Sequence, residues 1–169
     1  PEVKDLVELI KSRIPIIVVE TDEETRAVQL FVRASKEMSR SLYRWTVTDG
    51  LSAIRHHRRE SESYKEPADV LRYMWNLSYQ GLYLLIDYHP FISEPRIVRM
   101  IKDLALKADK NRQTIIFLSH QFDVPDELRP YAAKFELRLP DEEALNKIVT
   151  ETAKAYSREN GGLKLRVSR

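Results

Sequence analysis

Three side chains that can bind a metal or move a proton follow apolar runs in this sequence. Asp87 and His89 come after the run 83–86, and His120 follows the run 114–119. Two imidazoles and one carboxylate are acceptable ligands for zinc or iron. A hydrogen-bonded cluster that ties two loops together is the commoner use of such a set, and we favour it. The sequence therefore predicts a polar cluster of His89 and His120 without a metal, and a metal-dependent hydrolase is the last of three functional alternatives.

Asp87 also belongs to a second pattern, in which four largely apolar residues precede an aspartate. Tyr83–Ile86 and Asp87 match the Walker B form, whose aspartate helps to hold magnesium in an active ATPase. In such an enzyme a glutamate directly after the aspartate orients the attacking water, and here Tyr88 takes that position. Ser119 stands where ring ATPases place a residue that senses the γ-phosphate. We interpret Asp87 only as Walker-B-like and Ser119 only as sensor-like, and we assign no catalytic residue.

The loop after the first predicted strand argues against a nucleotide site. Phosphate binding at such a loop needs glycines, a lysine and backbone amides that point into open space. The four glycines of the chain, at 50, 81, 161 and 162, form neither the Walker A nor the Rossmann pattern. The loop instead has four carboxylates in the five positions Glu20–Glu24. We expect Thr21 and Glu24 to form a capping box that occupies the first free amides of the next helix, so that the protein's own side chains fill the site.

Apolar runs and amphipathic segments alternate along the chain and must position these residues. Strands are expected at 14–20, 42–47, 82–87, 114–119 and 135–139, and helices at 3–10, 21–39, 67–78, 93–108 and 141–156. The polar segment 48–66 is expected to be a long loop. This alternation predicts an α/β three-layer sandwich with a five-stranded, mostly parallel sheet and helices on both faces. Sites in such folds lie outside the carboxyl ends of the strands.

Length and composition narrow the class of protein. The 169 residues fit one domain with a small appendage, and we assign 1–160 to the α/β domain and 161–169 to a basic tail or the start of a connection to a further module. The absence of cysteine excludes a disulfide scaffold and a thiol nucleophile. The longest apolar run is too short to span a membrane, and no leader sequence is present, so we expect no membrane partner and a cytoplasmic location.

Basic residues gather in one part of the chain, although the whole sequence has 28 Lys and Arg against 26 Asp and Glu. The run Arg55-His56-His57-Arg58-Arg59 lies in the predicted loop. A solvated loop is the reading we favour, and a docking surface for phosphates or for an acidic protein face is the alternative. Together with Arg40 and Arg44, and with Tyr43 or Trp45 for base stacking, this run would make a nucleic-acid-binding module, which is our second functional alternative.

Several segments resemble the amino-terminal region of one ATPase family. They are Leu42–Leu51, Asp87–Phe91, Arg99 with Asp103–Ala105, Ile115–Ser119, Pro125–Leu128 and Leu139–Asp141. The pattern is similar to that of the hypothetical-chloroplast-frame (Ycf-type) AAA ATPases of plastids, cyanobacteria and other bacteria, and the resemblance covers about residues 5–160. Members of that family have a degenerate AAA-like first domain without Walker A, followed by a complete ATPase domain.

The resemblance implies that this chain is the degenerate, P-loop-NTPase-like first domain. As such it would be a non-catalytic interaction or regulatory domain that positions the ATPase module or holds a client. It implies no cofactor for this chain, and ATP with magnesium in the parent's ATPase module. The partners would be that carboxy-terminal module and an unknown protein client in a ring oligomer, in the cytoplasm or in the plastid stroma of an alga or plant. Arg129 stands where ring ATPases place a trans-acting arginine finger, although we favour a solvated turn residue.

Overall fold

The structure is a computed structural model that describes residues 1–54, 58–138 and 153 of the chain. The chain divides into two compact units, Pro1–Leu137 and Arg138–Arg169. All elements described below belong to the first unit. The predicted helix 141–156 and the predicted domain boundary at residue 160 fall outside the described residues, and both stay predictions.

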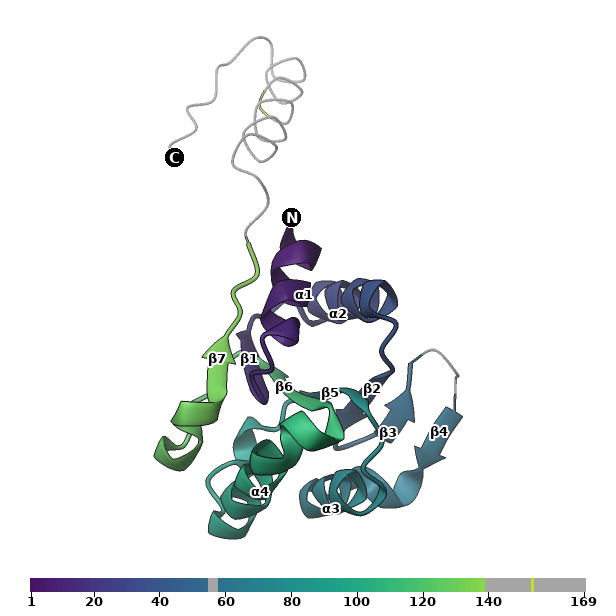
Figure 1. Cartoon of the computed structure of the whole chain (residues 1–169), viewed down its shortest axis with the longest axis vertical. Helices are drawn as coiled ribbons and strands as arrows, with labels where there is room; N and C mark the ends of the chain where they lie inside the picture. Colours follow the sequence, from purple (N-terminus) through teal and green to yellow (C-terminus); the bar gives the residue numbers. More distant parts are fainter. Residues whose placement is uncertain (55–57, 139–152, 154–169) are drawn as a thin grey trace. The chain divides into compact units, whose positions relative to one another are not determined.

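Seven strands form one sheet in the order β4-β3-β2-β5-β6-β1-β7. Four successive pairs, from β2 to β7, are parallel. These five parallel strands are β1 (Ile16–Glu20), β2 (Leu42–Thr46), β5 (Gly81–Ile86), β6 (Gln113–Ser119) and β7 (Ala132–Lys134). The predicted mostly parallel sheet is therefore confirmed, and β5, β6 and β1 lie side by side in it (Figure 1).

The predicted count of five strands is wrong, because the segment expected to be a polar loop adds two antiparallel strands. β3 (Gly50–Ala53) pairs with β2, and β4 (Arg58–Ser61) pairs with β3 before a short 3-10 helix, η1 (Glu62–Lys65). Gly50 adopts a φ of 71° at the turn that reverses the chain, a conformation that glycine tolerates without strain. Leu51 is fully buried and faces Trp45 in the register of β2 and β3. A strand with so few apolar residues has no detectable alternation.

The last strand lies earlier than predicted. The sequence indicates a strand at 135–139, but β7 spans Ala132–Lys134 and begins directly after the 3-10 helix η3 (Asp126–Tyr131). The amide of Phe135 still donates a hydrogen bond to the Val18 carbonyl at 2.9 Å. Phe135 and Leu137 pack against the buried side chains between the sheet and the first two helices. The apolar alternation that predicts a strand here thus reflects packing beyond the strand's end.

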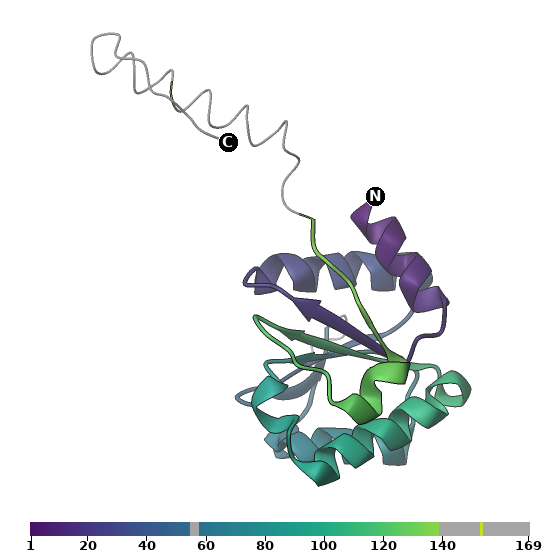
Figure 2. The same cartoon turned by 90° about the vertical axis from the view of Figure 1, so that its left-hand side faces the viewer.

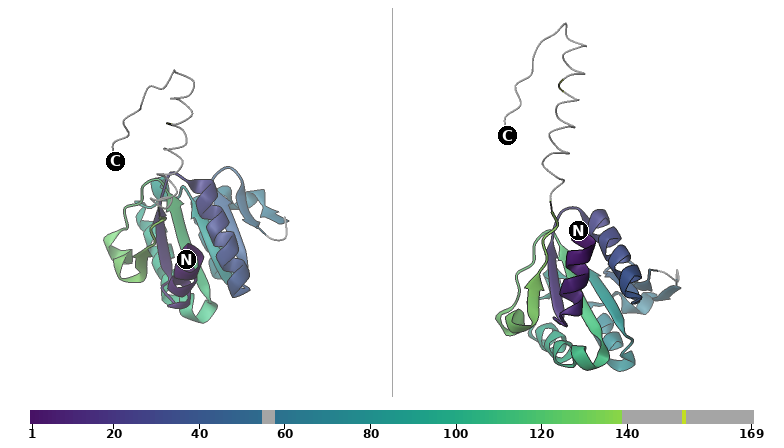
Figure 3. Two further views of the ribbon diagram at one scale, coloured as in Figure 1. Left: turned by 90° about the horizontal axis from the view of Figure 1, so that it is seen from above. Right: turned by 45° about the horizontal axis from the view of Figure 1, so that its top comes forward.

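Two helices cover each face of the sheet. α1 (Glu2–Lys11) and α2 (Glu24–Met38) pack together on one face, and α3 (Pro67–Leu77) and α4 (Pro95–Asn111) on the other (Figures 1 and 2). The view from above in Figure 3 shows α1 and α2 lying along the sheet, with the β3–β4 hairpin at one edge. The predicted three-layer sandwich is confirmed. α3 and α4 both begin with proline, which suits the first helical turn because its missing N–H needs no partner there.

The strands separate two hydrophobic cores. Along β5, Leu82, Leu84 and Ile86 point toward α1 and α2, whereas Tyr83 and Leu85 point toward α3 and α4. All six residues of β5 are buried, as expected for a central strand covered by helices on both faces. This packing fixes β5 and its neighbours, so the residues at their carboxyl ends have defined positions. None of the helices in the described part of the chain is long and apolar enough to cross a membrane.

Candidate functional site

The carboxyl ends of β1, β5 and β6 bring the predicted strand-end residues to one edge of the sheet. Glu20 and Ser119 are paired in the register of β1 and β6. The amide of Asp87 donates a hydrogen bond to the Leu118 carbonyl at 2.9 Å, and the amide of Thr21 donates one to the Ser119 carbonyl at 2.9 Å. The three strand ends are therefore neighbours, and the chemistry of this edge depends on where their side chains point.

The carboxylate of Glu20 links the end of β1 to two neighbouring segments. Its Oε1 lies 2.9 Å from Nζ of Lys134 on β7, and its Oε2 accepts a hydrogen bond from the amide of Phe122 at 3.4 Å. The hydrogen bond from the Lys134 ammonium lowers the pKa of the Glu20 carboxyl, and the Phe122 amide adds to this, although partial burial acts in the opposite direction. Glu20 thus stabilises the edge of the sheet, in a place where a phosphate-binding loop would need open backbone amides.

The predicted capping box does not form. α2 begins at Glu24 with Glu23 as its N-cap, and no side chain caps its first turn. Thr21 is still tied to β6 through its amide, so its hydroxyl reaches only the amide of Glu23, at 3.0 Å. Glu24 turns toward Arg44 instead, at 3.9 Å. The acidic side chains of this loop therefore surround the start of α2 without occupying its amides, which corrects the expectation that they fill the site.

Asp87 and Tyr88 point in opposite directions. Asp87 is exposed and adopts a φ of 54°, a left-handed conformation that aspartate tolerates better than most residues. Tyr88 is 1% exposed, and its hydroxyl donates a hydrogen bond to the Pro67 carbonyl at 2.6 Å. Burial raises the pKa of this hydroxyl, and the charge of Glu94 raises it further. The residue in the position of the water-orienting glutamate is thus directed into the core between the sheet and α3.

Aromatic neighbours hold Tyr88 in that position. Its ring lies 5.2 Å from Trp45, 5.6 Å from Phe117 and 5.9 Å from Phe91, measured between centroids. Tilted and edge-on arrangements of this kind are favourable contacts between aromatic rings. The sequence shows that Tyr88 replaces a glutamate, but only the packing shows that the side chain leaves the strand-end edge.

Ser119 is also turned away from any ligand at this edge. It is buried at the end of β6, and its hydroxyl donates a hydrogen bond to the Gln121 carbonyl at 2.6 Å. This bond closes the turn that follows β6. This hydroxyl therefore stabilises the loop, and its proton is not available to donate a hydrogen bond to a phosphate.

His89 and His120 contact each other, but no third ligand joins them. Their ring centroids are 5.0 Å apart and the rings are nearly perpendicular. Nδ1 of His89 is buried and has no hydrogen-bond partner. Across residues 1–54 and 58–138, no three His, Cys, Asp or Glu side chains come close enough to hold a metal ion. The two histidines thus form a ring pair, and the described part of the chain supplies no ligand set for the metal-hydrolase alternative.

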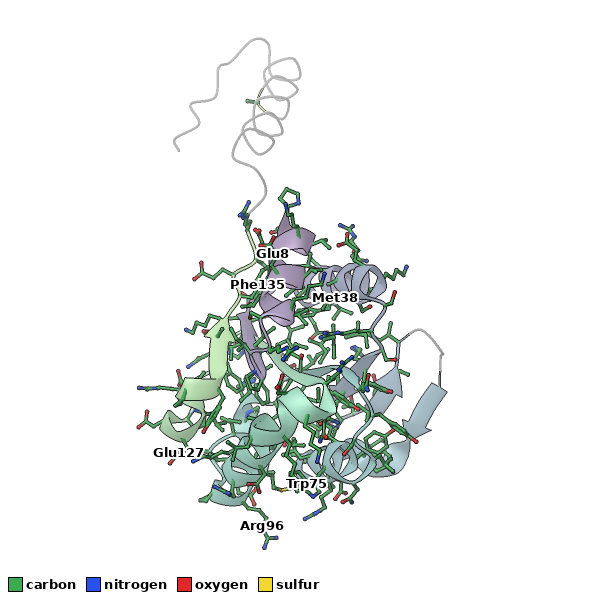
Figure 4. All side chains as sticks on the ribbon, viewed as in Figure 1. Glu8, Met38, Trp75, Arg96, Glu127 and Phe135 are labelled. Carbon is green, nitrogen blue, oxygen red and sulfur yellow. The ribbon has the colours of Figure 1, made fainter. Side chains whose placement is uncertain are left out.

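A cleft of about 860 Å³ lies beside this histidine pair, between the amino-terminal half of α4 and the connection from β6 to η3. Its walls carry charges of both signs: Arg99 and Lys102 come from α4, Asp123 comes from the connection, and Glu127 comes from η3. Figure 4 labels Glu127, which lies on η3. Sequence reasoning missed this cleft, and the only available signal was the spacing of Arg99 and Lys102 on the polar face of the helix.

Arg129 lies on η3 and forms a surface ion pair. Its guanidinium is 3.0 Å from the Asp126 carboxylate, and the two side chains are 71% and 83% exposed. A pair of this kind contributes little to stability. The placement is that of the solvated turn residue that we favoured, and a role as an arginine finger stays a prediction about an assembled ring.

The residues suggested for nucleic-acid binding are only partly described. Arg55, His56 and His57 fall outside the described residues, and only the backbone of Arg58 and Arg59, in β4, is described.

The aromatic residues offered for base stacking are engaged elsewhere. Trp45 is fully buried and its indole N–H donates a hydrogen bond to the Tyr64 carbonyl at 2.6 Å. Tyr43 stacks on Tyr83 with ring centroids 4.7 Å apart, and Arg44 lies 3.4 Å from Asp49. The expectation that Trp45 is available for a nucleic-acid base is therefore wrong, because the ring is part of the core.

Comparisons with known proteins assign the family. A family model described as SpoVK-like AAA ATPase, N-terminal domain, matches residues 2–137. The chain is 28% identical over 149 residues to an AAA domain-containing protein, ycf46, from Trieres chinensis. This match covers 86% of the present chain and 30% of the Trieres protein. The chain is 29% identical over 158 residues to ycf46 from Pyropia yezoensis, with 91% and 32% covered.

Among solved structures, one of Drosophila ORC bound to poly(dA/dT) DNA and Cdc6 matches with a TM-score of 0.44 and 11% identity, covering 89% of this chain and 30% of that one. The chain spans about a third of the length of the curated relatives it matches. The family model covers nearly all of the unit that carries the sheet. This chain belongs to the family of SpoVK-like AAA ATPase N-terminal domains.

Proposed function

We propose that this domain does not bind or hydrolyse ATP, and that it acts as a non-catalytic interaction and regulatory domain of a longer AAA ATPase. The observation that carries the proposal is the burial of Tyr88. In an active domain the residue after the Walker B aspartate must reach the attacking water. Here that residue is Tyr88, which is in the core with its hydroxyl bonded to the Pro67 carbonyl. The Walker-B-like Asp87 is therefore not followed by a side chain that could orient water.

The loop after β1 supports the same proposal. Asp22, Glu23 and Glu24 are exposed around the start of α2, and Glu20 is bonded to Lys134. Glu23 is paired with Arg26 at 2.9 Å, and Glu24 lies 3.9 Å from Arg44. An ATP phosphate placed there would meet four carboxylates and would compete with them for cations that they already hold, Lys134 among them. Electrostatic repulsion therefore replaces the attraction that a helix amino terminus otherwise offers to an anion.

The longer protein is part of the proposal. Because the chain spans about a third of its relatives, the remaining two thirds leave room for a carboxy-terminal ATPase module. We infer that ATP and magnesium bind to that module, that the protein assembles as a ring, and that this domain positions the module or engages a protein client. The cleft between α4 and the β6–η3 connection, with charges of both signs, suits a peptide segment of such a partner. We expect the protein to act in the cytoplasm, or in the plastid stroma of an alga or plant.

Isothermal titration calorimetry of this chain with ATP and excess magnesium tests the proposal. We expect no saturable heat up to millimolar ATP, and no release of phosphate over the uncatalysed background. The variant Asp87→Asn is the matched control, because it removes the Walker-B-like carboxylate at an exposed position and should leave this result unchanged. One-to-one binding with micromolar affinity that is lost in Asp87→Asn would overturn the proposal.

A further inference from the structure

A second cavity lies near the amino ends of β1 and β6, at the opposite edge of the sheet from Asp87 and Ser119. Its volume is about 450 Å³. Cations from the ends of three helices line it: Arg13 follows α1, Arg40 follows α2, and Lys110 and Arg112 end α4. We call this cavity the basic basin.

The basic basin carries an excess of positive charge. Asp109 is the only carboxylate among its lining residues, and it lies 3.4 Å from Arg13. In the ranges that the structure describes, Arg40, Lys110 and Arg112 form no ion pair. Four cations against one carboxylate leave a net charge of +3 around one cavity. Cations that converge without carboxylates repel one another, so an anion that binds between them is stabilised.

Helix ends explain part of this arrangement but not all of it. The carboxyl end of a helix has a partial negative charge, which a nearby cation stabilises. One cation at the carboxyl end of each helix would be enough for this. Arg13 and Arg112, however, adopt φ values of 67° and 52°, at positions where glycine is the usual residue because it has no strain there. The chain thus keeps an arginine at two positions where the backbone favours glycine, and both side chains line the basic basin.

Gln113, at the amino end of β6, also lines the basic basin. It is 4% exposed, and its Nε2 donates hydrogen bonds to the carbonyls of Met74 and Tyr79 at 3.0 and 3.2 Å. These bonds direct its side chain toward α3, and its Oε1 is buried away from water. The positive charge of the arginines and of Lys110 is therefore the feature of this cavity that a ligand would meet.

We propose that the basic basin binds a small phosphomonoester. Arginine guanidinium groups pair with phosphate oxygens through two parallel hydrogen bonds, and three arginines line this cavity. A volume of about 450 Å³ suits a metabolite-sized ligand. A nucleic-acid strand needs an open groove along several phosphates, so it fits the basic basin less well.

Calorimetric titrations with sn-glycerol 3-phosphate and with inorganic phosphate test this proposal. We expect saturable one-to-one binding of both, weaker at high salt. Arg112→Gly removes the cation and suits the observed φ, so the fold should be retained. We expect this variant and Arg40→Gln each to weaken binding about tenfold. Ser78→Gly is the matched control, because Ser78 ends α3 with a φ of 51° and lies outside the lining of the basic basin.

Three results would contradict the proposal. One is the absence of saturable binding for both probes, and another is equal affinity in the wild type, Arg112→Gly and Arg40→Gln. The third is a short single-stranded oligonucleotide that binds more tightly than either probe and is weakened by Arg112→Gly, which would assign the basic basin to nucleic acid. The same variant separates this proposal from the proposed function. ATP binding that Arg112→Gly abolishes belongs to the basic basin, whereas ATP binding that survives it concerns the strand-end edge.

Discussion

At the scale of single residues, the direction of the Tyr88 side chain has the largest consequence for function. A glutamate in this position would have to point out over the edge of the sheet, toward a nucleotide. Tyr88 points inward, and its hydroxyl satisfies the Pro67 carbonyl inside the α3–α4 core. The same backbone position therefore serves packing here, and the proposed loss of catalysis would have the same cause as this packing.

Substitutions at Tyr88 should show this role in stability. Tyr88→Phe removes the hydrogen bond from the buried hydroxyl to the Pro67 carbonyl and should lower the free energy of unfolding by about 1–2 kcal/mol. Tyr88→Glu restores the residue of an active ATPase but places a carboxylate among aromatic rings, so it should cost more than about 3 kcal/mol and create no ATPase activity. Urea unfolding followed by fluorescence measures both changes. Tyr79→Phe, at an exposed tyrosine, is the control and should change little. If Tyr88→Glu is as stable as the wild type, the side chain is not fixed in the core.

The ion pair of Glu20 with Lys134 should make stability depend on pH. The pKa of Glu20 is lowered in the folded state from an ordinary value of 4.5. Its contribution to stability is therefore fully present above pH 4.5 and is lost as the pH falls through the lower, folded pKa. Lys134→Met should reduce the acid dependence of the unfolding midpoint in this range, whereas Lys4→Met, at an exposed lysine of α1, should leave it as in the wild type. Identical acid dependence in the two variants would argue against the pair.

The sequence shows which residue types lie at the candidate site, but it does not show where their side chains and amides point. The carboxylates at Glu20–Glu24 and the tyrosine after Asp87 are visible in the sequence and predict a departure from an active site. The capping box at Thr21 could not be judged in this way, because the amide of Thr21 is bonded to β6, far along the chain. Long-range pairing of this kind leaves no local pattern.

At the scale of elements, the β3–β4 hairpin extends the sheet beyond β2. Leu51 supplies its main apolar contact and joins the core that also contains Trp45 and Tyr83. The 3-10 helix η1 then returns the chain to α3, and the carbonyl of Tyr64 in η1 accepts the indole hydrogen bond of Trp45. The hairpin thus covers one end of the core that also holds Tyr88.

Truncating the anchor of the hairpin tests its part in the core. Leu51→Ala leaves a cavity in a fully buried position and should lower the free energy of unfolding by about 2–5 kcal/mol. Ser52→Ala changes the adjacent, half-buried residue and should have an effect below about 0.5 kcal/mol. Thermal or urea unfolding distinguishes the two variants. Similar losses for both would mean that the hairpin is not anchored through Leu51.

The strength of the local pattern decided which elements could be predicted. β1, β2, β5 and β6 are apolar runs flanked by polar residues, and α2, α3 and α4 repeat apolar residues at helical spacing, so all seven were predicted near their observed bounds. β3 and β4 have four residues each, and β7 has three. Strands this short depend on pairing with neighbours that are distant in sequence, which a local pattern does not reveal.

At the scale of the whole molecule, the sheet-bearing unit coincides with the family match. The unit Pro1–Leu137 contains both hydrophobic cores, and the family model covers residues 2–137. We therefore expect a fragment of residues 1–137 to fold alone, with an unfolding midpoint within about 3 °C of the full chain. Calorimetry and amide NMR spectra of the two proteins provide the comparison. A fragment ending at residue 125, which lacks β7, is the control and should be strongly destabilised. A clearly less stable 1–137 fragment would place the domain boundary later, nearer to residue 160.

The two edges of the sheet have opposite electrostatic character. Carboxylates from Glu20 to Glu24 and Asp87 lie at the carboxyl edge, whereas the basic basin lies near the amino ends of β1 and β6. We expect the first edge to repel an anionic ligand and the second to attract it. This reverses the arrangement of a working nucleotide-binding domain, in which the carboxyl edge receives the phosphates.

An amide NMR titration of the chain with magnesium and ATP tests this account most directly, because it reports on each edge separately. We predict that the amide signals of Glu23, Glu24 and Asp87 do not shift at millimolar ATP, and that any response is confined to residues of the basic basin such as Arg112 and Gln113. Saturable shifts at Glu23, Glu24 and Asp87 that persist in Arg112→Gly would show a nucleotide bound at the strand ends and would contradict the account.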